Sequence, residues 1–115
     1  MGIDTYSFME SEIENLKTQA SYSNWPVVYL LNDTKRVYIG ETVNIHRRIK
    51  EHHQDGVRKT LKKINIIYDD QFNKSATLNI ETKLIEYMSA DKNFKIMNGN
   101  GGQRKHDFFE KKKVV

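Results

Sequence analysis

The chain has 115 residues, 37% of them hydrophobic and 30% charged, which suits one domain with a modest core and is too short for two. It contains no cysteine, which excludes disulfides and thiolate metal sites and is consistent with a reducing, cytoplasmic location. No apolar run approaches the roughly 20 residues of a membrane span, no secretory signal is visible, and the net charge is a mild +4. We therefore expect a cytoplasmic protein without a membrane partner.

The N-terminal part of the chain predicts a helix with an acidic character. Apolar residues recur there at helical spacing, namely Met9, Ile13, Leu16 and Ala20. This spacing predicts an amphipathic helix over about residues 7–21. Residues 1–26 hold four acidic residues against one lysine. We expect residues 1–24 to form a helical N-terminal extension.

A β-hairpin is predicted next. Residues 27–31 are a β-branched and aromatic run, residues 32–35 offer turn chemistry, and residues 37–40 resume the extended pattern. Because side chains alternate along a strand, Tyr29 and Tyr38 are expected on one face, opposite the aliphatic residues. Tyrosines in strands are usually packing residues, so this pattern alone does not distinguish a structural pair from a functional one.

A basic helix follows the hairpin over residues 44–54, with Asn44 as its predicted N-cap. Arg48 and His52 lie four residues apart beside its isoleucine stripe, so both can face the edge of the core. Arg48 can serve a site there or form a structural salt bridge. Residues 44–65 hold seven Lys and Arg against two acidic residues, which indicates a polyanionic partner or a solvated basic surface.

A third strand is predicted over residues 64–68 and a long helix over residues 75–90, with Ser75 as its cap. On a helical wheel Glu81 falls near the middle of the apolar arc, whereas Glu86 falls on the solvent-facing side. A carboxylate on an apolar face is costly unless it is paired or binds a cation. Glu81 is therefore either half of a structural ion pair or a functional carboxylate.

The order helix, hairpin, helix, strand, helix predicts a small α/β fold. We interpret residues 1–115 as a single domain whose motif core covers residues 27–98. Residues 98–102 predict an irregular loop, and residues 103–115 a basic tail.

Two triplets and four later polar residues match the motifs of a known nuclease family in type and spacing. Val27-Val28-Tyr29 is a degenerate form of the first triplet, and Tyr38-Ile39-Gly40 is the second. The later matches are Arg48, ten residues after Tyr38, then His52, Glu81 and Asn98. On these residues the chain resembles the GIY-YIG nucleases over about residues 27–98.

The resemblance implies a small, mainly antiparallel three-stranded sheet flanked by helices, and a metal-dependent endonuclease that hydrolyses DNA phosphodiester bonds. It implies one divalent cation, Mg²⁺, held by Glu81, with Arg48 stabilising the charge on the phosphoryl group. Tyr38, with Tyr29 beside it, would orient or deprotonate the attacking water, and which tyrosine takes the proton stays open. His52 and Asn98 complete the catalytic set.

The DNA partner, structured or single-stranded, is expected to contact four cations through its backbone, namely Arg58, Lys59, Lys62 and Lys63. Residues 72–78 and 98–102 also resemble bacterial proteins in which a GIY-YIG domain precedes an ATPase/helicase-like module. The chain would then be the N-terminal piece of a larger protein. The main alternative is a nucleic-acid-binding module that targets such a partner with weak or no cleavage. A third hypothesis, an interaction domain without nucleic acid, leaves a buried Glu81 unexplained.

Overall fold

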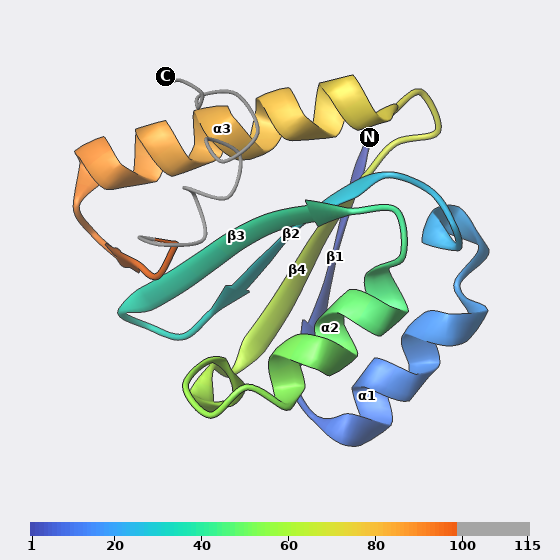
Figure 1. Cartoon of the computed structure of the whole chain (residues 1–115), viewed down its shortest axis with the longest axis horizontal. Coiled ribbons are helices and arrows are strands. Elements are labelled where there is room, and N and C mark those ends of the chain that lie inside the picture. Colours follow the sequence, from blue (N-terminus) through green and yellow to red (C-terminus); the bar gives the residue numbers. More distant parts are fainter. Residues whose placement is uncertain (99–115) are drawn as a thin grey trace, which may run out of the picture.

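A five-stranded mixed sheet with helices on both faces makes up the computed structural model, which describes residues 1–98 (Figure 1). The strand order is β1-β4-β2-β3-β5, antiparallel throughout except that β5 runs parallel to β3. The strands are β1 (Gly2–Ser7), β2 (Val27–Asn32), β3 (Arg36–Thr42), β4 (Lys63–Tyr68) and β5 (Lys95–Ile96). The α-helices are α1 (Glu10–Asn15), α2 (Ile45–His53) and α3 (Lys74–Asp91). Short 3₁₀ turns are η1 (Leu16–Thr18), η2 (Ala20–Tyr22) and η3 (Arg58–Thr60).

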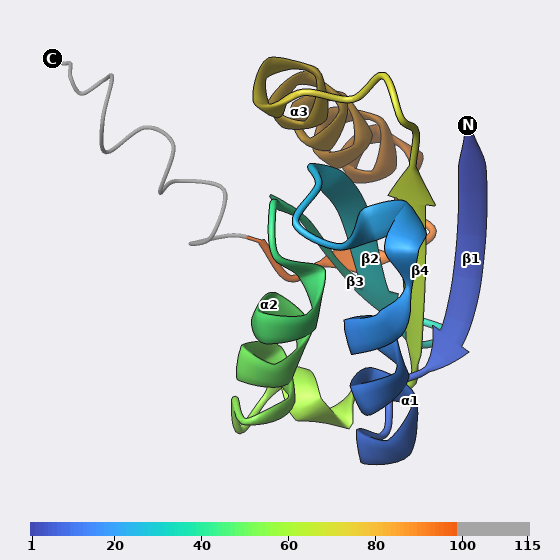
Figure 2. The ribbon, with the colours of Figure 1, turned by 90° about the vertical axis from the view of Figure 1, so that its right-hand side faces the viewer.

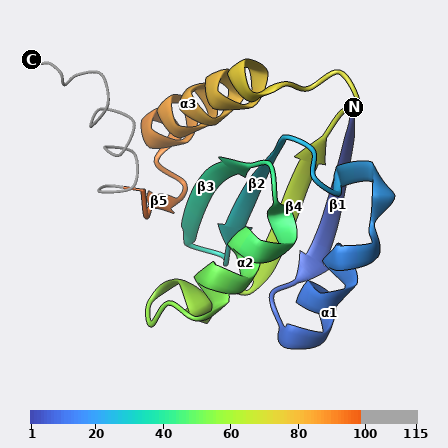
Figure 3. The same ribbon diagram turned by 45° about the vertical axis from the view of Figure 1, so that its right-hand side comes forward.

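The sheet lies between α3 on one face and α1 and α2 on the other (Figures 2 and 3). Each face carries a hydrophobic core. On one face, α3 packs on β2 and β3 around Val28, Val37 and Ile39. On the other face, α1 and α2 cover the larger core, which contains both tyrosines of the β2–β3 hairpin. Residues that alternate along β3 therefore face different helices, and this alternation decides which side chains can meet.

The sheet has five strands and not the expected three, but the three expected strands form its centre. The predicted hairpin forms β2 and β3, and the predicted third strand forms β4, all antiparallel. At the edges β1 and β5 were not predicted. β5 has only two residues, paired with the start of β3. β1 turns Gly2, Asp4 and Tyr6 inward and leaves Ile3 64% exposed, so it carries no apolar inner face that periodicity could detect.

The expected helix over residues 7–21 is shorter in the structure. Met9 is half-exposed and occupies the N-cap position of α1, and the helix ends at Asn15 before breaking into η1 and η2. The apolar spacing is nevertheless meaningful, because Ile13 and Leu16 are both buried.

The other two predicted helices are confirmed with one correction. The Asn44 side chain accepts a hydrogen bond from the Arg47 amide and caps α2 as predicted. For α3 the cap is Asn73, which accepts from the Ala76 amide at 2.8 Å, and Ser75 already lies inside the helix. Within the described residues 1–98, no helix is long and apolar enough to cross a membrane. The expected basic tail, residues 103–115, lies outside these residues.

Candidate active site

The two hairpin tyrosines lie on the face covered by α2, as predicted, and Gly40 makes room for one of them. Tyr29 pairs across the strands with Gly40, and its ring lies over the glycine. A Cβ atom at position 40 would overlap the Tyr29 ring and hydroxyl. The glycine of the second triplet is therefore a steric requirement of the tyrosine in the first.

Tyr29, Tyr38 and His52 form a buried aromatic cluster. The Tyr29 and Tyr38 rings are stacked at 6.4 Å between centroids, and the His52 ring lies 4.8 Å from Tyr38. The Tyr29 hydroxyl and His52 Nε2 are 2.7 Å apart, a hydrogen bond whose donor depends on the histidine tautomer. All three residues are at most 3% exposed. The histidine therefore lies inside the core and not at its edge.

Two arginines border this cluster. Arg48, on α2, lies at the solvent-facing side of the cluster with a third of its side chain exposed. Its Nη1 forms an ion pair with Glu51 at 3.0 Å. Burial opposes its charged form, but the adjacent Tyr29 phenol, Glu51 and Tyr38 hold the pKa of the Arg48 guanidinium above its usual value. Arg58, from η3, lies over the Tyr38 ring at 5.1 Å from its centroid. Both cations are therefore positioned to meet an anion that approaches the tyrosines.

Asn98 is bound to the backbone of β3. Its amide oxygen accepts from the Ile39 amide at 2.9 Å, and its Nδ2 donates to the Ile39 carbonyl. It is 4% exposed. The side chain thus pairs with the residue between Tyr38 and Gly40 as a neighbouring strand would, which supports a positioning role for this predicted site residue.

Glu81 is buried on α3 at 3% exposure, as the helical wheel predicted. Thr77, one turn earlier on the same stripe, is also buried and donates to Glu41 at the end of β3. That contact places the stripe beside the end of β3. Tyr87, on the same helix, is 69% exposed, and Glu86 is exposed as expected.

Glu41 is a buried carboxylate that the sequence interpretation missed. It directly follows the second triplet and accepts from Lys74 Nζ through both oxygens, at 2.7 and 2.8 Å. Strand alternation could have found it, because Glu41 shares a face with Val37 and Ile39. This pair anchors the start of α3 to β3 beside the stripe that carries Glu81.

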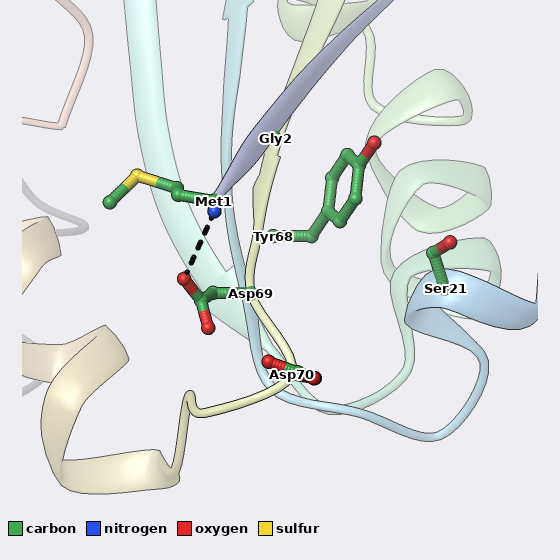
Figure 4. A pocket seen from close by; sticks show the side chains of 6 residues that line it. All are labelled: Met1, Gly2, Ser21, Tyr68, Asp69 and Asp70. Atoms are coloured by element: carbon green, nitrogen blue, oxygen red, sulfur yellow. Dashed lines mark ion pairs between the residues drawn. The ribbon is translucent and has the colours of Figure 1, made fainter.

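The predicted backbone-binding cations divide into two groups. Lys59, Lys62 and Lys63 are exposed, as expected for a surface that contacts phosphates, whereas Arg58 is half-buried. One open hollow of about 580 Å³ is lined in part by Lys62, Lys63 and Phe94. Another, of about 420 Å³, lies beside the N-terminus, where the Met1 amino group forms an ion pair with Asp69 (Figure 4). Tyr68 and Asp70 also line this second hollow, which shares no residue with the aromatic cluster.

Within residues 1–98, no group of three or more His, Asp or Glu side chains is placed to hold a metal ion. Mg²⁺ often binds through one or two carboxylates, with water and substrate phosphate as its remaining ligands. A buried carboxylate such as Glu81 fits this donor set, because a cation offsets the cost of burying its charge.

Residues 26–95 match the family model described as the GIY-YIG catalytic domain. The chain belongs to the GIY-YIG family. The GIY-YIG match spans more than half of the chain and includes both tyrosines, Arg48, His52 and Glu81, while Asn98 lies just beyond it. Comparisons with curated proteins and with solved structures returned no match. Family membership indicates a nuclease-type fold and a nucleic-acid substrate.

Proposed function

We propose that this protein is a metal-dependent endonuclease that hydrolyses DNA phosphodiester bonds in the cytoplasm. The observation that carries the proposal is the buried cluster of Tyr29, Tyr38 and His52, bordered by Arg48, in a chain of the GIY-YIG family. Clusters of buried polar and titratable groups beside a cation are more typical of catalytic sites than of ordinary packing.

The proposed proton acceptor is Tyr29. Its hydroxyl lies 2.7 Å from His52 Nε2, so the histidine can take the phenolic proton. The Arg48 guanidinium stabilises the resulting phenolate, because an adjacent positive charge favours the ionised form. Tyr38, stacked beside Tyr29, orients the water that Tyr29 deprotonates.

Stabilisation of the negative charge on the phosphoryl group is the second requirement of the reaction. Arg48 meets it, since its guanidinium can donate two parallel hydrogen bonds to phosphate oxygens. Glu81 would hold Mg²⁺, which when bound supplies stabilisation of the leaving oxygen. Asn98 keeps the Tyr38-Ile39-Gly40 backbone in place through Ile39. Arg58, Lys59, Lys62 and Lys63 would contact the DNA backbone.

A second candidate function is DNA binding with weak or no cleavage, as a module that targets a C-terminal ATPase/helicase-like partner. The observation that favours it is burial, because Tyr29 and Tyr38 are only 1% and 3% exposed. Hydrolysis needs a water molecule in contact with the phenols, and little of either tyrosine is open to solvent. Phosphate binding through the partly exposed Arg48 and Arg58 does not require access to the buried phenols.

A cleavage assay distinguishes the two functions. Duplex, single-stranded and branched DNA are incubated with the protein in Mg²⁺ and in EDTA, beside Glu81→Gln and the exposed control Glu86→Gln. We expect cleavage only with Mg²⁺, a loss on the order of 10²–10³-fold in Glu81→Gln, and no loss in Glu86→Gln. Thermal melting of both variants checks folding. Bound but uncut DNA under all conditions would favour the binding module.

A further inference from the structure

Arg58 differs from the lysines that follow it in the chain. Its guanidinium carbon lies 5.1 Å from the centroid of Tyr38, on the face that carries the aromatic cluster. Its side chain is about one-third exposed, so part of the guanidinium remains open to a ligand. Lys59, the next residue, points elsewhere because successive residues of a 3₁₀ turn are rotated by about 120°. Arg58 is therefore the η3 cation that lies at the tyrosines.

The Arg58 guanidinium is also incompletely bonded. Its Nε is buried and has no hydrogen-bond partner among residues 1–98. Its Nη2 lies 3.4 Å from Asp55, a distance that fits an ion pair and not a close bidentate hydrogen bond. A buried donor without a partner costs free energy and calls for an explanation. The exposed part of the guanidinium would gain an acceptor from a phosphate oxygen at the cluster.

Asp55 fixes the position of this arginine. Its Oδ2 accepts from the backbone amides of Val57 at 3.1 Å and Arg58 at 2.8 Å, while its Oδ1 faces the Arg58 guanidinium. The hydrogen bond from the Arg58 amide is the main cause that lowers the pKa of the Asp55 carboxyl. Asp55 is therefore ionised at neutral pH, and it holds both the turn and the side chain that extends from it.

We infer that Arg58 is a second phosphate-binding residue at the Tyr38 end of the site, and that Asp55 is its positioning residue. The inference rests on the proposed nucleic-acid substrate. Arg48 and Arg58 would contact the phosphate from two sides of the aromatic cluster, and Arg58 would bind the scissile group or the phosphate next to it. A planar guanidinium suits this role better than an ammonium, because it presents paired donors at a fixed geometry.

The test compares Arg58→Gln, Arg58→Lys and Asp55→Asn with Arg47→Gln. Arg47 is a matched control, since it is 64% exposed on α2 and forms an ion pair with Glu51. Cleavage of one DNA oligonucleotide is measured to separate kcat from KM, and affinity is measured for the same oligonucleotide in EDTA. We expect kcat to fall by about 10²-fold in Arg58→Gln and less in Asp55→Asn, with Arg47→Gln unchanged.

Arg58→Lys keeps the charge but not the paired donors, so it should recover affinity more than kcat. It also guards against misfolding of Arg58→Gln, which thermal melting would reveal. Wild-type kcat in a folded Arg58→Lys or Arg58→Gln variant would overturn the inference while the nuclease proposal stands.

If the wild type binds DNA without cutting, the nuclease proposal fails. A roughly tenfold affinity loss in Arg58→Gln beyond that of Arg47→Gln would then support the Arg58 contact, and equal affinities would overturn it. A wild type that neither binds nor cuts DNA overturns both.

Discussion

A tyrosine packed over a cross-strand glycine occurs twice in this small sheet. Tyr29 covers Gly40 between β2 and β3, and Tyr68 covers Gly2 between β4 and β1. In both pairs a side chain on the glycine would overlap the aromatic ring. An aromatic ring compensates for the weak strand propensity of glycine by covering its backbone. At Gly40 the same packing also directs the Tyr29 hydroxyl to His52.

Gly40→Ala should therefore damage both stability and activity. The Tyr29 ring cannot move aside easily, because it is buried and hydrogen-bonded to His52. We expect a loss of about 1–3 kcal/mol in the free energy of unfolding, the usual cost of overpacking, together with loss of cleavage. Gly56→Ala is the control, since an added methyl group there meets no atom within 4 Å. Chemical denaturation of both variants checks this, and equal stabilities would contradict it.

The candidate site could be predicted where one-dimensional periodicity determines burial. Strand alternation placed Tyr29 and Tyr38 together, and helical periodicity found the buried Glu81. The partners of Arg58 and Glu41 could not be predicted in this way. Arg58 reaches Tyr38 only because a 3₁₀ turn brings it back toward β3, and Lys74 reaches Glu41 from a segment 33 residues away. Such contacts depend on tertiary packing, which the local pattern does not encode.

At the scale of elements, polar inner faces explain why the N-terminal strand was not predicted. On β1 the inward Asp4 accepts from the Tyr22 hydroxyl at 3.1 Å and the Tyr68 hydroxyl at 3.4 Å. Tyr6, also inward, is hydrogen-bonded to Tyr22. Hydrogen bonds thus satisfy the polar groups on the inner face of β1, where apolar residues would normally lie. Hydrophobic alternation detects only the apolar kind of strand, and it identified β2, β3 and β4 for that reason.

The start of α3 offers a direct test of a corrected prediction. Asn73 accepts from the Ala76 amide, while Ser75 is exposed within the first turn of the helix. Asn73→Ala should therefore lower the free energy of unfolding by about 0.5–2 kcal/mol, the usual cost of losing an N-cap. Ser75→Ala should change stability little or raise it slightly, because alanine has the higher helix propensity. Urea unfolding of the two variants shows which residue is the N-cap. A larger loss of unfolding free energy in Ser75→Ala would mean that Ser75 caps α3, as the sequence predicted.

Across the whole molecule, charge of the two signs is concentrated in different segments. The chain up to residue 26 is acidic, and Asp69 and Asp70 line the hollow beside the N-terminus. Cations gather instead in residues 44–65, which supply α2, η3 and the start of β4. The aromatic cluster lies beside this basic segment, since α2 contributes His52 and η3 contributes Arg58. A polyanion should therefore approach the molecule from the side that carries the tyrosines.

DNA binding by this surface should be weak and strongly dependent on salt. In the described residues 1–98, ion pairs engage Arg47, Arg48 and Arg58, whereas the exposed Lys59, Lys62 and Lys63 take part in none. Each phosphate that a cation neutralises releases counterions, which adds about 0.9 to the negative slope of log affinity against log salt for duplex DNA. Five contacts, those of Arg48, Arg58 and these three lysines, predict a slope of about −4.5, or roughly a 500-fold loss of affinity between 50 and 200 mM salt.

Fluorescence anisotropy titrations of one labelled duplex over that range measure this slope. The double variant Lys62→Gln/Lys63→Gln should reduce its magnitude by about 1.8, because two contacts are lost. Arg47→Gln should leave the slope unchanged, since Arg47 is 64% exposed, makes none of the five contacts above and is paired with Glu51. An affinity that barely changes with salt would mean that the basic segment is only a solvated surface. A steep slope unaffected by the lysine substitutions would mean that the phosphates bind elsewhere on the protein.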